Sequence, residues 1–137
     1  MAQLLISHKA DLTDTHPSGA TILYTSSQEG HSDVVKLLLV NKANVNQAKT
    51  TNGASPLYYA SQKGHSDVVK LLLMNKANVN QARNDGILPI VIASFNGHLN
   101  MVQLLVSSKG DITDDAIRYA KSQGHPEIER FLKSHKQ

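Results

Sequence analysis

A segment of nineteen residues occurs twice in this chain, and this repetition limits the possible folds more than any other feature. Residues 30–48 read GHSDVVKLLLVNKANVNQA and residues 64–82 read GHSDVVKLLLMNKANVNQA, so that the two copies differ only at Val40 and Met74. The pattern returns more loosely at Gly97, after a similar interval, and a last copy begins at Gly124, after a shorter one. Residues 4–6 and 9–13 align with residues 37–39 and 42–46. A nearly fixed period of this length indicates a stack of similar structural units.

Each full copy predicts a pair of helices joined by tight turns. A glycine that favours a positive φ opens each copy, at Gly19, Gly53 and Gly86. Thr21 or Ser55 can then cap a first helix, and Pro56 and Pro89 fit its first turn, where no N–H is needed. This first helix runs to the glycine of each Gly-His pair, after which a second helix begins.

The second helix is apolar on almost all sides. Val34, Leu37 and Leu38 form one face, and Val35 and Leu39 widen it beyond a single stripe. The positions left for solvent are Asp33, Lys36, Val40 and Asn41. Such a helix has to be covered from several directions. We therefore expect neighbouring repeats to bury it and to supply most of the stability.

These residues resemble the ankyrin repeat family. The closest match is GASPLYYAS at residues 53–61, followed by Gly64-His65, VVKLLL at residues 68–73 and ANVN at residues 77–80. The resemblance implies an all-α, ankyrin-type helical solenoid, in which paired antiparallel helices are joined by hairpin loops. We expect a single domain over residues 1–137, with a half-repeat at 1–15, three full repeats at about 16–49, 50–82 and 83–113, and a shortened cap at 114–137.

The chain departs from the family pattern at two repeated positions. Where the family has a histidine in the first helix, this chain has Tyr24, Tyr58 and Val91. Where the family has a glycine after the second helix, it has Lys42 and Lys76. That position usually requires a left-handed backbone, so we expect these two lysines to be strained by about 1 kcal/mol each.

The two ends are expected to be atypical. The chain begins inside a second helix, which indicates either a piece of a longer array or a degenerate N-terminal cap. Leu4, Leu5 and Ile6 would then be partly exposed and could mediate self-association. At the other end no hairpin precedes the last first helix, where we expect Asp115 to be the N-cap. A final helix from Pro126 to about Ser134 has the polar outer face of a cap.

The sequence favours neither catalysis nor metal or cofactor binding. There are no cysteines, and no nucleophile elbow, phosphate loop or HExxH motif is present. Four histidines recur after a glycine, at His31, His65, His98 and His125. They would lie about one repeat apart, roughly 10 Å, too far to share one metal ion. We expect them to be structural, and we expect no enzymatic activity.

Nucleic acid and membranes are not expected partners. The net charge is only +3, and the positive charge of the lysines that recur at positions 9, 42, 76 and 109 is diluted by Asp11, Asp33, Asp67 and Asp111 and lacks interleaved aromatic residues. No apolar stretch is long enough to span a bilayer, and the N-terminus lacks the features of a signal peptide. We therefore expect a cytoplasmic protein.

The resemblance implies a protein–protein interaction module, acting as scaffold, adaptor or targeting domain. Its partner would contact the hairpin tips and the concave helix face. The candidate residues, at positions that vary between copies, are Gln28, Glu29, Thr51, Asn52, Gln62, Lys63, Asn84, Asp85, Ile87, Phe95, Asn96, Ser122 and Gln123, and Pro17, Ser18, Ala20 and Ala54 occupy equivalent hairpin positions. Phe95 is either a binding anchor or a ring that folds onto the cap. The alternative function is the substrate-recognition arm of a longer enzyme.

Overall fold

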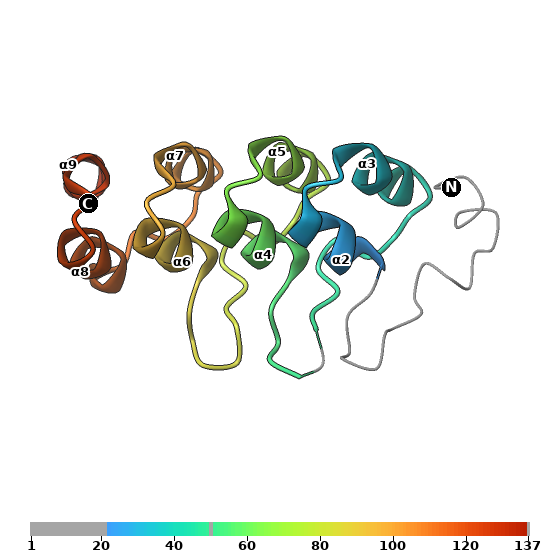
Figure 1. Ribbon diagram of the computed structural model, residues 1–137, viewed down its shortest axis with the longest axis horizontal. Helices are drawn as coiled ribbons and strands as arrows, with labels where there is room; N and C mark the ends of the chain where they lie inside the picture. Colours follow the sequence, from blue (N-terminus) through green and yellow to red (C-terminus); the bar gives the residue numbers. More distant parts are fainter. Residues whose placement is uncertain (1–21, 50, 137) are drawn as a thin grey trace.

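The computed structural model describes residues 22–49 and 51–136, and in this part of the chain helix pairs stack side by side (Figure 1). The helices are α2 (Ile22–Glu29), α3 (Ser32–Val40), α4 (Pro56–Lys63), α5 (Ser66–Met74), α6 (Pro89–Phe95), α7 (Leu99–Ser107), α8 (Asp114–Ser122) and α9 (Pro126–His135). Helices α2, α4, α6 and α8 form one row, from which the hairpin loops project, and α3, α5, α7 and α9 form the other (Figure 1). The expected all-α repeat solenoid is confirmed. The N-terminal half-repeat, with Leu4, Leu5 and Ile6, lies outside the described residues.

Local sequence signals explain where the first helices begin and end. The Ser55 hydroxyl accepts a hydrogen bond from the Tyr58 N–H at 3.1 Å, so that Ser55 caps α4 as predicted. Pro56 and Pro89 occupy the first turns of α4 and α6. Gly64 ends α4 with a left-handed backbone, at φ 78°.

The expected N-cap of α8 was wrong by two positions. Thr113, not Asp115, caps this helix, because the Thr113 backbone is extended and its hydroxyl accepts a hydrogen bond from the Ala116 N–H at 3.2 Å. Asp114 and Asp115 lie in the first turn instead, where their negative charges still favour the helix N-terminus.

The core is continuous between repeats and consists of small and aliphatic side chains. The second helices bury Val35 and Leu38, Val69 and Leu72, Val102 and Leu105, and Ile128 and Leu132. In the first helices, Ser27, Ser61 and Ser94 are buried at equivalent positions, where a small side chain lets adjacent helices approach closely. The four positions of α3 and its C-cap that were expected to face solvent are exposed. Each repeat is therefore stabilised by its neighbours.

The backbone after α3 and α5 has the predicted left-handed conformation, and the backbone after α7 shares it. Lys42 and Lys76 have φ 68°, and Lys109 has φ 69° at the equivalent place after α7. Lysine has a Cβ atom that disfavours this region, so each residue retains local strain.

Candidate functional site

The hairpin loops and the first helices lie on the same side of the molecule (Figure 1). We call the surface formed by these loops and the outward-facing side chains of α2, α4, α6 and α8 the hairpin face. Most candidate residues on it are exposed: Glu29, Thr51, Lys63, Asn84, Asp85, Phe95, Asn96, Ser122 and Gln123. Gln28, Asn52, Gln62 and Ile87 are half-buried. Ala54 is fully buried and cannot contact a partner, and Pro17, Ser18 and Ala20 lie outside the described residues.

The two described hairpins are held in a fixed register. Each is closed at its base by a backbone hydrogen bond, from the Lys49 N–H to the Ala54 carbonyl at 2.8 Å and from the Arg83 N–H to the Ile87 carbonyl at 2.9 Å. The Asn84 N–H donates to the Asn52 carbonyl at 2.8 Å and joins the two loops. The loop tips are therefore part of one connected structure.

The Asn52 side chain, although on the candidate surface, is engaged within the fold. Its Nδ2 donates to the Tyr59 hydroxyl at 2.8 Å, and its Oδ1 accepts from the Ala54 N–H at 3.0 Å. This amide holds its hairpin against α4.

The repeated histidines connect neighbouring repeats. The Nε2 atoms of His65, His98 and His125 lie 3.0, 3.0 and 3.2 Å from the carbonyl oxygens of Gln28, Gln62 and Phe95, respectively. The predicted structural role is confirmed for these three histidines, and it extends beyond the turn to the preceding repeat. Because the three carbonyls belong to candidate residues at equivalent positions, these bonds also fix the backbone that presents the candidate side chains.

Phe95 borders a small apolar cleft between α6, α8 and the preceding hairpin. The cleft is lined by Arg83, Ile87, Val91, Ile92, Phe95 and Tyr119 and has a volume of about 180 Å³. The Phe95 and Tyr119 rings meet edge to face, with centroids 5.6 Å apart, yet Phe95 remains 39% exposed. The ring therefore packs against the cap and also remains accessible from solvent.

Sequence reasoning missed a set of cations stacked on tyrosines. Lys49 lies over the Tyr24 ring at 5.4 Å from its centroid, and Arg83 lies over the Tyr58 ring at 5.1 Å. The two tyrosines are related by the repeat offset, and so are the two cations, so the repeat period contained the signal for this pairing. In the cap, Arg118 lies over Tyr119 at 5.4 Å.

Ion pairs neutralise two carboxylates of the hairpin and cap region. Arg83 Nη2 lies 2.6 Å from Asp85 Oδ2, and Arg118 Nη2 lies 2.6 Å from Asp115 Oδ1. The hydrogen bonds from Arg83 hold the pKa of the Asp85 carboxyl below its usual value. Asp85 is exposed, so this pair orders the loop more than it stabilises the fold.

Burial governs the ionisation of two tyrosines under the hairpin face. Desolvation raises the pKa of Tyr24 and of Tyr58 above the usual value for a phenol, because the charged form would be taken out of water. The Tyr58 side chain is fully buried, and its hydroxyl has no hydrogen-bond partner among the described residues.

Replacing Tyr58 with phenylalanine should therefore leave the free energy of unfolding unchanged or raise it by up to about 1 kcal/mol. The unfolded phenol ionises near pH 10, whereas the folded phenol has a raised pKa and keeps its proton to a higher pH, so Tyr58 reduces stability as the pH rises above about 10. The advantage of Tyr58→Phe should widen above pH 10 in denaturant titrations. Tyr59→Phe is the matched control, because it deletes a hydroxyl bonded to Asn52, and it should be destabilising. Equal losses in both variants would contradict the prediction.

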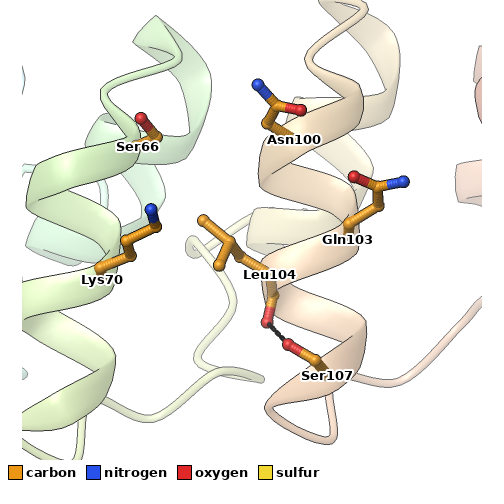
Figure 2. Close-up of a pocket in the computed structure, with 6 residues that line it drawn as sticks. All are labelled: Ser66, Lys70, Asn100, Gln103, Leu104 and Ser107. Carbon is orange, nitrogen blue, oxygen red and sulfur yellow. Dashed lines mark hydrogen bonds between the residues drawn. The ribbon is translucent and has the colours of Figure 1, made fainter.

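A second, polar groove lies on the opposite row, between α5 and α7 (Figure 2). It has a volume of about 400 Å³ and is lined by Ser66, Lys70, Asn100, Gln103, Leu104 and Ser107. Lys70 is its only charged residue, and the Ser107 hydroxyl is bonded to the Leu104 carbonyl at 2.9 Å. This groove lacks the paired titratable groups that acid–base catalysis requires.

The described residues contain no group of three or more His, Asp or Glu side chains that could hold a metal ion. In residues 22–49 and 51–136, no helix has the length and apolar character needed to cross a bilayer.

Comparison with protein families agrees with this architecture. A model for three copies of the ankyrin repeat matches residues 1–83, and a model for a single ankyrin repeat matches residues 85–118. A search of curated proteins found no match to the chain. Ankyrin repeats are generally protein–protein interaction modules and are typically non-catalytic. The matched segments cover most of the sequence, and the chain therefore belongs to the ankyrin repeat family.

Proposed function

We propose that this chain binds a partner protein through the hairpin face, using the loop tips and the exposed ends of the first helices. The observation that carries the proposal is the apolar cleft beside Phe95, which opens on a surface that is otherwise largely polar. Glutamine occupies the equivalent positions 28 and 62, so the repeat framework does not require a ring at Phe95. Accessible aromatic side chains of this kind are frequent anchors in protein interfaces.

The rigidity of the hairpin face supports this mode of binding. The bonds of His65, His98 and His125 to the preceding repeats fix the candidate backbone, and the Asn84–Asn52 bond fixes the loop tips. A surface that is ordered in advance loses little conformational entropy when a partner binds. Recognition should therefore proceed without rearrangement of the helices.

The size of the cleft favours a partner side chain over a free small molecule. Its volume of about 180 Å³ is below the range of roughly 300–1,000 Å³ that is typical of small-molecule pockets. One large apolar side chain would fill it, and the surrounding polar residues would form the rim of a wider interface.

Truncation of Phe95 tests the proposal. Partners captured from a lysate of the native cells by the wild-type chain should bind Phe95→Ala at least tenfold more weakly, because the anchor ring is lost. The Tm of this variant should change little, since the ring is 39% exposed. Phe131→Ala is the matched control, because it removes a half-buried ring from α9, in the other row, and should retain partner affinity.

If Phe95→Ala lowers the Tm while partner affinity is unchanged, the ring belongs to the packing against Tyr119. The binding surface would then consist of the polar residues of the hairpin face. If Phe131→Ala weakens binding as strongly as Phe95→Ala, the partner does not dock on the hairpin face.

A further inference from the structure

The charges near the cleft indicate the chemistry of the segment that would occupy it; this inference rests on the proposed function. Asp85 and Asp115 are already paired with Arg83 and Arg118, each at 2.6 Å. Lys63 and Lys49 have no carboxylate within ion-pair distance among the described residues. Lys49 lies over the Tyr24 ring of α2, whereas Lys63 ends α4, so the unpaired positive charge on the α4 side of the cleft is that of Lys63.

The acidic residues of the hairpin face do not cancel this excess. Glu29 is exposed and has no ion pair within the described residues, but it lies at the end of α2, one repeat away from Lys63 on the side opposite to Phe95. Lys63 ends α4, one repeat away from Phe95. A carboxylate that approaches Lys63 from the α6 side would be attracted by that lysine and would lie farther from Glu29 than the lysine does.

We infer that the partner presents an extended segment in which one bulky apolar side chain enters the cleft and an Asp or Glu approaches Lys63. Gln62, which precedes Lys63, occupies the position equivalent to Phe95, and equivalent positions in adjacent repeats lie roughly 10 Å apart. An extended chain spans about 3.3 Å per residue, so the acidic residue stands about three positions from the apolar one. The spacing and the two residue types together define the recognised motif.

The Phe95–Tyr119 pair sets the apolar half of this motif. The two rings meet edge to face and line the cleft together with Ile87 and Ile92. A ring or a branched side chain of the partner could pack against these apolar groups. Arg83 forms part of the same wall with its guanidinium held by Asp85, so a cation on the partner would gain little there.

Selection from a phage-displayed library of random peptides tests the inference on the full chain. Peptides of about twelve residues are long enough to cross three repeats when extended. We expect the enriched sequences to share a bulky apolar residue with Asp or Glu about three positions away. The dissociation constant of a selected peptide should rise about tenfold with Phe95→Ala, and also with Lys63→Glu. A matched peptide with lysine in place of the acid should bind Lys63→Glu better than it binds the wild type.

Lys70→Glu is the matched control for charge, because Lys70 is also an exposed helical lysine but lies on the opposite row. It should leave peptide affinity within twofold of the wild type.

Peptides that require Phe95 but bind Lys63→Glu as tightly as the wild type would overturn the acidic motif and leave the proposed function standing. Peptides that bind independently of both residues would reject the motif and the hairpin face together. Failure to enrich any sequence would overturn recognition of an extended segment, whereas partner capture with Phe95→Ala tests the proposed function separately.

Discussion

Replacing Gly64 with alanine should lower the free energy of unfolding by about 2–3 kcal/mol, because two independent penalties act at this position. Gly64 has φ 78°, a conformation that disfavours any residue with a Cβ atom. The added Cβ would also lie only 2.9 Å from the His98 ring. Moving that ring would weaken the contact of its Nε2 with the Gln62 carbonyl, now at 3.0 Å, and so loosen the junction between two repeats.

Gly124→Ala separates the two penalties. Gly124 has φ 76°, but a Cβ added there would have no neighbouring atom within 4 Å, so this variant should lose only about 1 kcal/mol. When Gly64→Ala is combined with His98→Ala, the clash between the new Cβ atom and the histidine ring should disappear. Denaturant titration of the wild type, the two single variants and the double variant measures the free energy of coupling between the two positions. If Gly64→Ala and Gly124→Ala are equally destabilising and the cycle shows no coupling, the histidine does not constrain the glycine.

The repeat period predicted most of the fold because local signals recur in every copy. Ser55, Pro56 and Gly64 define the ends of α4 through capping, a fixed φ and a left-handed turn, each of which depends on only a few neighbouring residues. The left-handed backbone at Lys42 and Lys76 was predicted from the resemblance, because the ankyrin family has a glycine at this place after the second helix.

The start of α8 was harder to predict, since three consecutive residues could each cap it. Thr113, Asp114 and Asp115 all have side-chain oxygens that can accept from a helix N–H. The choice depends on which residue leaves the preceding loop with an extended backbone. Thr113 meets that condition.

The details of the candidate site depended on contacts between distant residues. Ala54 occupies a hairpin position in the sequence, but its side chain is buried beneath the loop. The cleft requires Tyr119 beside Phe95, and the shortened interval between the last two copies obscures which cap residue faces α6. The cations on Tyr24 and Tyr58 were encoded in the repeat, but the sequence alone does not show that the hairpin base reaches these rings.

Replacing Lys42, Lys76 and Lys109 together with glycine should raise the free energy of unfolding by about 3 kcal/mol and the Tm by roughly 10 °C. Each lysine has a φ near 68°, which glycine adopts without steric strain. The three effects should be nearly additive, because each residue lies in a different repeat and their contacts are separate. Glycine also increases the entropy of the unfolded chain, which limits the gain to about 1 kcal/mol per site.

Ser108→Gly provides a control beside one of these lysines. Ser108 has φ −95°, a conformation open to every residue, so glycine relieves no strain there and should instead destabilise the chain by about 0.5–1 kcal/mol. Each lysine also follows a helix C-terminus, where its charge is favourable, and measuring the melting curves at elevated salt reduces that contribution. A lower Tm in the triple variant, or equal shifts for Lys109→Gly and Ser108→Gly, would show that the left-handed backbone is not strained. A gain confined to the lysine sites would locate that strain at the exits of α3, α5 and α7, where the family pattern has glycine.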